Sequence, residues 1–286
     1  MNIFRCKLCI LPSSKPDLEF DANGICQGCL AFKNRKLINW ADKEKKLFEI
    51  FKNYKKHSDY DCIIPVSGGK DSLRQALWVR DHLLLNPLLV CCSYPPTQMS
   101  HLGALNLENL IEHGFDLEIR NPAPSSARRL SRYTFFEFGN VCKASEMALV
   151  SSLPKCAIEN DIKIAFFGEN PALQEGDYAT LGVNEIDASQ LGQLNTLQNE
   201  NLNWIAENVS HKNHIDQYLY PLEDKFLESQ INMYYLGPVW NDWGIFENAL
   251  FSVLNGLEVR VDQEKITGDL SNASMLDEDF TNINMM

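Results

Sequence analysis

Residues 60–72 read Tyr-Asp-Cys-Ile-Ile-Pro-Val-Ser-Gly-Gly-Lys-Asp-Ser, and this stretch decides the fold. The apolar run at residues 62–66 predicts a buried strand, and the spacing of apolar residues at 72–85 predicts a helix. The two glycines between them predict a tight turn. A strand, a glycine turn and a helix start form a geometry that binds phosphate, because glycine lets backbone N–H groups approach an anion at the positive end of the helix.

The residues of this turn supply the groups that phosphate binding needs. The candidate nucleotide-binding residues are Ser67, Gly68, Gly69, Lys70, Asp71 and Ser72. The glycines expose main-chain N–H groups, Lys70 and Ser72 add side-chain donors, and Asp71 can face a metal ion carried by a nucleotide. The spacing differs from that of the Walker loop. An ordinary glycine turn is the alternative, but the complete hexapeptide after a strand favours phosphate binding.

The segments that follow alternate between the two kinds of secondary structure. Strands are predicted at residues 88–92, 115–119 and 162–167, and helices at 105–113 and 146–160. This alternation predicts an α/β fold with a doubly wound parallel sheet. Ligands of such sheets bind beyond the carboxyl ends of the strands. We therefore expect one binding mouth formed by the loops at residues 67–72, 93–96, 121–124 and 168–171.

A second site is predicted at the N-terminus. Cys6-x-x-Cys9 is followed by Cys26-x-x-Cys29. Two cysteines at this spacing on a tight turn point toward one centre, and two such pairs complete a tetrahedral metal site. Because four protein ligands leave no open position, we expect a structural zinc ion. An iron–sulfur cluster is the alternative, since four thiolates suit both, and four unrelated buried cysteines would need no metal.

The chain is predicted to have one main domain and a small module. Its 286 residues are divided into a zinc-binding module at 1–36, a linking amphipathic helix at 37–58, a nucleotide-binding catalytic domain at 59–255 and a C-terminal tail at 256–286. A chain of this length can bury a sizeable core.

Composition and charge exclude several classes of protein. The apolar content of 45% and the charged content of 22% are typical of a soluble globular protein. No apolar run is long enough to span a bilayer, and the first residues do not form a signal peptide, so we expect a cytoplasmic protein without membrane contact. The net charge of −12 disfavours broad contact with nucleic acid. Nine cysteines in such a chain indicate metal ligands or reactive thiols before disulfides.

Further stretches narrow the class. They are Tyr94-Pro95-Pro96, Gly139-Asn140-Val141-Cys142-Lys143 and Gly168-Glu169-Asn170-Pro171-Ala172-Leu173. Together with the cysteine pairs and the loop at 67–72, they resemble the N-acetyl sugar amidotransferase family, a branch of the PP-loop ATP pyrophosphatases. The resemblance runs from about residue 6 to about residue 280, and members of the family continue into a further helical segment beyond the equivalent of residue 284. The tail is therefore expected to be short for the family.

The resemblance implies a reaction, its cofactors and its partners. Members convert an acetamido group on a bacterial surface-glycan sugar, such as an O-antigen sugar or pseudaminic acid, into an acetamidino group. The amide oxygen would attack the α-phosphate of ATP, releasing pyrophosphate, and ammonia would then displace AMP. ATP, Mg²⁺ and structural zinc are the implied cofactors. The implied partners are an N-acetylated sugar, free or nucleotide-linked, and a separate glutaminase that supplies ammonia; a homo-oligomer is compatible with this.

The resemblance also implies site residues. The catalytic candidates are Lys70, Asp71, Cys142, Lys143 and Glu169, and the substrate-binding candidates are Tyr94, Arg128, Arg129 and Asn170. Lys143 could lower the pKa of the Cys142 thiol. Glu169 could act as a base toward incoming ammonium, or it could cap a helix. The arginines, together with Arg132, could hold phosphates or a sugar carboxylate, or they could form a solvated helix face.

Two other functions are compatible with the same loop. One is a PP-loop enzyme that thiolates tRNA, in which Cys142 and Cys156 would carry sulfur or bind a cluster. The alternative for each cysteine is a buried small apolar residue, which is favoured for Cys156. The other is a degenerate, non-catalytic nucleotide-binding subunit, against which the intact loop argues. Cys62, Cys91 and Cys92 are expected in the core. The aromatic residues expected to be core or docking surface are Tyr234, Tyr235, Trp240, Trp243 and Phe246.

Overall fold

The computed structural model describes residues 3–15, 18–52, 54, 58–93, 99–170, 186–189, 203–209, 211–261, 272–273 and 276. The chain forms two compact units. The first contains Met1–Lys55, Phe167–Gln198 and Met233–Trp243, and the second contains Lys56–Phe166, Asn199–Asn232 and Gly244–Met286. The predicted limits of the metal module, the linking helix and the catalytic domain stay predictions.

The sheet has five strands in the order β3-β2-β1-β4-β5. The strands are β1 (Cys62–Pro65), β2 (Pro87–Cys92), β3 (Asp116–Arg120), β4 (Ile164–Phe167) and β5 (Asn232–Tyr235). β1 pairs with β2 and with β4, and β2 pairs with β3, each time in parallel. Because the strand order reverses direction at β1, the predicted doubly wound parallel sheet is confirmed. β5 was not predicted.

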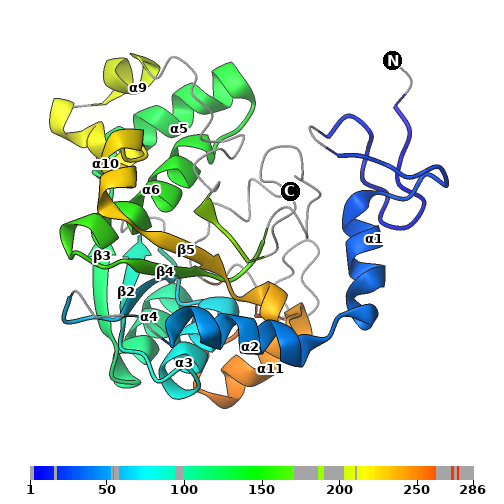
Figure 1. Cartoon of the computed structure of the whole chain (residues 1–286). Helices are drawn as coiled ribbons and strands as arrows, with labels where there is room; N and C mark the ends of the chain where they lie inside the picture. Colours follow the sequence, from blue (N-terminus) through cyan, green and yellow to red (C-terminus); the bar gives the residue numbers. More distant parts are fainter. Residues whose placement is uncertain are drawn as a thin grey trace. The chain divides into compact units, whose positions relative to one another are not determined.

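Helices cover both faces of the strands in the second unit. Figure 1 shows α3 (Lys70–Asp81) and α4 (His101–Glu112) on one side of β1–β3, and α5 (Pro124–Phe138) and α6 (Lys143–Glu159) on the other. Right-handed crossovers require this arrangement when the strand order reverses. The remaining helices are α1 (Gln27–Asn34), η1 (Arg35–Leu37), α2 (Trp40–Phe51), α9 (Asn203–Asn208), η3 (Lys212–His214), η4 (Asp216–Tyr218), α10 (Glu223–Ser229), η5 (Gly237–Val239) and α11 (Ile245–Leu254).

The core of the second unit lies between these layers. Ile63, Ile64 and Leu89, on the central strands, are fully buried. Leu73 on α3 and Leu153 on α6 are buried to the same degree. Apolar side chains therefore fill both faces of the sheet, as expected for parallel strands that are covered on both sides.

The helices differ from their predicted limits in two informative places. α3 begins at Lys70, because Gly69 takes an extended conformation and serves as its N-cap. Pro154 lies inside the helix predicted at 146–160 and does not end α6, which continues through this buried residue to Glu159. A proline inside a helix costs one backbone hydrogen bond, and here burial of its ring among apolar neighbours offsets part of that cost.

The first unit also has an ordered apolar core. In α2, the predicted amphipathic helix, Leu47 is buried, and the ring of Phe51 lies edge-on to that of Tyr234, with centroids 5.6 Å apart. The other aromatic residues expected as core or docking surface divide into two groups. Tyr235, Trp240 and Trp243 are buried, whereas the side chain of Phe246, in the second unit, is 58% exposed.

The described helices include none that is both long enough and apolar enough to cross a membrane.

Candidate nucleotide-binding loop and metal centre

The loop after β1 turns at Gly68. This residue has a φ of +82°, in the left-handed region that favours glycine. A Cβ atom at this position would lie 3.1 Å from the backbone nitrogen of Leu107 and 3.2 Å from the carbonyl carbon of Asn106. Backbone conformation and lack of space both require glycine, so the loop lies directly against α4.

Replacing Gly68 by alanine should therefore cost more than either effect alone. We expect a loss of about 2–4 kcal/mol in the free energy of unfolding, from the left-handed conformation and the crowded backbone together. Gly139 provides the matched control, because it has a φ of +65° but no atom within 4 Å of its added Cβ. Gly139→Ala should cost only about 1 kcal/mol. Urea unfolding measures both, and equal losses would contradict the role of the contact with α4.

Hydrogen bonds within the loop fix its shape. The backbone N–H of Gly69 donates to Ser67 Oγ at 3.3 Å, and that of Ser67 donates to Ser72 Oγ at 3.4 Å. Ser72 Oγ in turn donates to the Gly69 carbonyl at 3.0 Å. The serines thus hold the turn at the start of α3, where unpaired N–H groups and the helix dipole favour an anion.

Two charged residues begin α3. Lys70 Nζ lies 2.7 Å from Asp71 Oδ2, and their side chains are 10% and 28% exposed. An incoming phosphate would compete with Asp71 for the ammonium group of Lys70, because both are anions. The pair is thus a charged, largely buried feature at the end of the glycine turn.

Two residues of α11 form hydrogen bonds with this pair, and no pattern in the sequence predicted them. Asn248 Nδ2 donates to Asp71 Oδ1, and Asn248 Oδ1 accepts from Arg74 NH1 at 2.6 Å. Ser252 Oγ donates to the Lys70 carbonyl at 2.6 Å. Asn248 and Asp71 are 177 positions apart, so no local pattern in the sequence could have linked them.

The remaining predicted residues occupy several elements. Cys142 is the N-cap of α6 and is half-buried. Lys143 is buried, and its Nζ lies 4.9 Å from the centroid of the Phe138 ring. Arg128 and Arg129 are exposed on α5. Glu169, which is exposed, and Asn170, which is buried, follow β4 in the first unit; Tyr94 lies outside the described residues.

Cys142 and Cys156 cannot act as a pair. Cys156 lies within α6, fourteen positions after the N-cap, which places the two residues roughly 21 Å apart along the helix. Cys156 is fully buried, and its Sγ donates to Glu118 Oε2 at 3.1 Å. Burial and this carboxylate raise the pKa of the Cys156 thiol to about 12. Cys156 is therefore a structural residue, as are Cys62 and Cys91, which are buried in β1 and β2 as expected.

A cavity lies beyond the ends of β2 and β3. Cys92, Ser93 and Pro122 line it from the strand ends, and Ala144 and Ser145 line it from the start of α6. The wall also includes Tyr218, whose buried hydroxyl has no hydrogen-bond partner among the described residues. The small side chains leave a narrow space with a few polar groups, at the edge of the sheet where the fold class predicts ligand binding.

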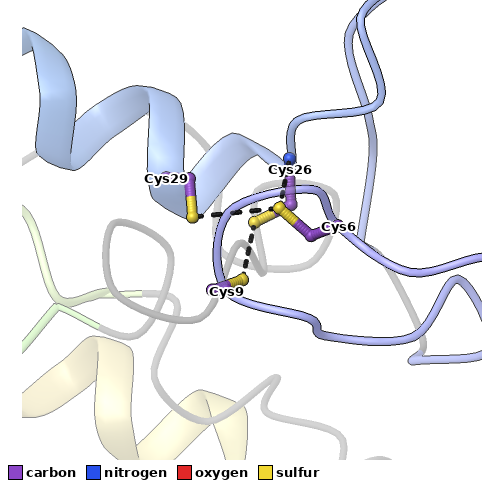
Figure 2. Close-up of side chains that lie close together, drawn as sticks. All are labelled: Cys6, Cys9, Cys26 and Cys29. Carbon is purple, nitrogen blue, oxygen red and sulfur yellow. Dashed lines mark hydrogen bonds between the residues drawn. The ribbon is translucent and has the colours of Figure 1, made fainter.

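The four N-terminal cysteines converge on one point. Figure 2 shows their sulfur atoms turned toward one another, and all lie within 4.8 Å of each other. The Sγ atoms of Cys6 and Cys29 are 3.9 Å apart, and those of Cys9 and Cys26 are 3.5 Å apart. A tetrahedral ion with bonds of about 2.3 Å to sulfur would separate its ligands by about 3.8 Å. The residues fit a metal ion.

The surroundings of Cys6 favour a thiolate. Burial opposes its ionisation, but backbone N–H groups from Cys9, Cys26 and Leu8 outweigh burial and lower the pKa of the Cys6 thiol to about 6. Burial raises the pKa of the Cys26 and Cys29 thiols. A bound cation would offset the effect of burial on thiol ionisation, because the charge of the metal stabilises all four thiolates.

Comparisons with known proteins give partial likenesses. No family model matches the chain. An uncharacterized protein of Methanocaldococcus jannaschii is 31% identical over 120 residues, which are 41% of this chain and 42% of that protein. The chain thus spans less than half the length of that relative.

Two solved structures are similar to this chain at low identity. The U34-tRNA thiolase NcsA from Methanococcus maripaludis, solved with its iron–sulfur cluster, is 13% identical, with 96% of this chain and 79% of that chain covered and a TM-score of 0.34. NMN synthetase from Francisella tularensis is 15% identical, with 87% and 92% covered and a TM-score of 0.36. At these scores neither likeness supports an inference about reaction or substrate.

Proposed function

We propose that this chain is an ATP-dependent N-acetyl sugar amidotransferase of the PP-loop ATP pyrophosphatase superfamily. The loop at residues 67–72 binds the nucleotide, and the acetamido oxygen of the sugar attacks its α-phosphate. Ammonia from a separate glutaminase then displaces AMP and leaves an acetamidino group. The observation that carries this proposal is the loop itself, with its left-handed Gly68, its serine hydrogen bonds and the start of α3.

The loop supplies what this reaction needs. An amide oxygen is a poor leaving group, so it must be converted to a phosphate ester before ammonia can replace it. The departing pyrophosphate carries developing negative charge, which backbone N–H groups and the Lys70 ammonium stabilise. Asp71 would hold the Mg²⁺ that the nucleotide carries, and the ion would offset negative charge on the phosphates.

The second unit offers surfaces for the sugar. The narrow cavity beside Ser93 and Ala144 suits a small acyl group, because most of the side chains in its wall are short. The exposed guanidinium groups of Arg128 and Arg129 suit the phosphates of a nucleotide-linked sugar. This cavity supports a sugar with an N-acetyl group more directly than it supports a large base.

The roles proposed for the other residues rest on the resemblance to the family. Glu169 accepts a proton from incoming ammonium, and Asn170 binds the sugar. Cys142 and Lys143 lie at the start of α6. They directly precede Ala144, which lines the cavity. The four N-terminal cysteines hold structural zinc. A single zinc ion matches their closely spaced sulfurs better than a cluster, which distributes its four cysteine ligands over two or four iron atoms.

Thiolation of tRNA has weaker support. The net charge of −12 opposes broad contact with RNA, and the separation of Cys142 and Cys156 along α6 prevents them from sharing sulfur or a cluster. A degenerate subunit is also less well supported, because each residue of the loop takes part in an ordered turn.

The substrate class is tested by incubating the protein with ATP, Mg²⁺, ammonium and candidate N-acetyl sugars, free and nucleotide-linked. Mass spectrometry should show a product about one mass unit lighter than the sugar, because oxygen is exchanged for NH. Omitting ammonium should abolish that product. A gain of about sixteen mass units would indicate a thioamide and would contradict amidination.

A further inference from the structure

We infer that Asn248 is a positioning residue for Asp71: it holds one oxygen of that carboxylate so that the other can turn from Lys70 to the metal ion of a bound nucleotide. This inference rests on the proposed function, because Asp71 meets a metal ion only if the loop binds a nucleotide. It assigns a role in the reaction to α11, an element with no motif in its sequence.

Asn248 is buried and contacts two residues of α3. Asn248 is 1% exposed, and its side chain lies between two residues of α3. Asp71 accepts a hydrogen bond from Asn248 Nδ2, and Arg74 donates to Asn248 Oδ1 at 2.6 Å. Asp71 and Arg74 are three positions apart on a helix, so their side chains share one face, and a single amide can reach both.

Arg74 determines the orientation of the side-chain amide of Asn248. An arginine side chain can only donate hydrogen bonds, so Arg74 must face the oxygen of Asn248. The nitrogen of Asn248 then points to Asp71 and donates to its Oδ1. Arg74 therefore fixes the orientation of the Asn248 amide, and that orientation presents a donor to the carboxylate of Asp71.

The two oxygens of the Asp71 carboxylate have partners of different kinds. Its Oδ2 is held by Lys70, a flexible side chain whose ammonium a phosphate can attract. Its Oδ1 is held by a buried amide on a fixed helix. Lys70 can exchange the carboxylate for a phosphate, which frees Oδ2, while Asn248 keeps the carboxylate in place.

Hydrogen bonds hold α11 in place at two positions. The buried Ser252 donates to the Lys70 carbonyl at 2.6 Å. At the end of α11, the carbonyl of Asn255 accepts from Asn109 Nδ2 at 3.2 Å, and His113 Nε2 lies 2.8 Å from the same oxygen. Because α11 is attached at both places, Asn248 stays fixed when Lys70 moves.

Asn248→Ala tests the inference through the dependence of nucleotide binding on Mg²⁺. The probe is an ATP analogue that cannot be cleaved between the α and β phosphates, titrated calorimetrically at graded Mg²⁺ concentrations. We expect the Mg²⁺ concentration for half-maximal binding to rise about tenfold, since a hydrogen bond to a charged group is lost. Binding without Mg²⁺ should change less than twofold.

Asn109→Ala is the matched control, because it removes a fastening of α11 without touching Asp71. Its Mg²⁺ requirement should stay within about twofold of the starting protein. Equal shifts in both variants would show that α11 acts only as a scaffold and would overturn the inference, as would no shift in Asn248→Ala. If that variant does not fold, Arg74→Met, which frees the amide to rotate, should raise the requirement about threefold; no change would overturn the inference.

Failure of the proposed function has a different signature. An unaltered protein that binds no analogue at any Mg²⁺ concentration would contradict nucleotide binding itself. An unaltered protein that binds the analogue with Mg²⁺, together with variants that bind it identically, would overturn the role of Asn248 alone.

Discussion

Asp71→Asn should lower the rate of AMP formation by about 100-fold or more, with little change in the overall fold. The substitution keeps the size of the side chain but removes the charge that, in the proposed function, binds the metal ion of the nucleotide. It also removes the ion pair with Lys70, in which Nζ and Oδ2 are 2.7 Å apart. The rate is measured by separating labelled AMP from ATP at saturating Mg²⁺.

Asp81→Asn is the control on the same helix. Asp81 pairs with the preceding residue, Arg80, at 2.6 Å, just as Asp71 pairs with Lys70, but it lies at the last residue of α3. Its pair is largely exposed and should contribute little to stability or activity. A similar loss in both variants would mean that ion pairs of α3 act on the fold, and Asp71 would have no special role.

The second large effect is expected at the metal centre. Cys26→Ser should lose most of the bound metal and unfold the N-terminal cysteine module, because metal-binding free energy is folding free energy in small metal-stabilised modules, at about 10 kcal/mol or more. Cys26 is 1% exposed and belongs to a core whose buried residues are Cys6, Leu18 and Cys26, so the apolar contribution to the stability of the module is small. Metal content per chain and protection of the module from limited proteolysis are the two measurements.

Cys92→Ser separates this effect from a general response to losing a thiol. Cys92 ends β2 and lies outside the metal centre, and burial raises the pKa of its thiol to about 12. Its variant should keep the full metal content. Metal retained in full by Cys26→Ser would contradict the assigned ligand set, and iron in place of zinc would favour a cluster.

Local pattern was enough to predict the central part of the fold. The strand before the glycine turn, the turn itself and the helix after it are all present, because each depends on neighbouring residues. β1 is buried between β2 and β4 and reads as a continuous apolar run. β5 and α11 could not be found in the same way. β5 reads Asn-Met-Tyr-Tyr, which is not a continuous apolar run, and α11 begins after Gly244 without a side-chain cap.

The site was predictable where the chemistry is carried by adjacent residues. The candidate phosphate loop and the cysteine pairs are of this kind: their residues form an ordered turn and a converging set of sulfur atoms. Asn248 was not predictable, because its contact with Asp71 exists only once α11 packs on α3. Cys156 was a functional candidate only for tRNA thiolation, and a buried apolar role was the favoured interpretation; the structure places it fully buried within α6.

The nucleotide products test the central claim most directly. ATP labelled at the α and γ phosphates should give AMP and pyrophosphate when Mg²⁺, ammonium and a suitable N-acetyl sugar are present, and Asp71→Asn should form both at least about 100-fold more slowly. ADP and inorganic phosphate as the products would contradict cleavage between the α and β phosphates, and with it the proposed role of the loop at residues 67–72.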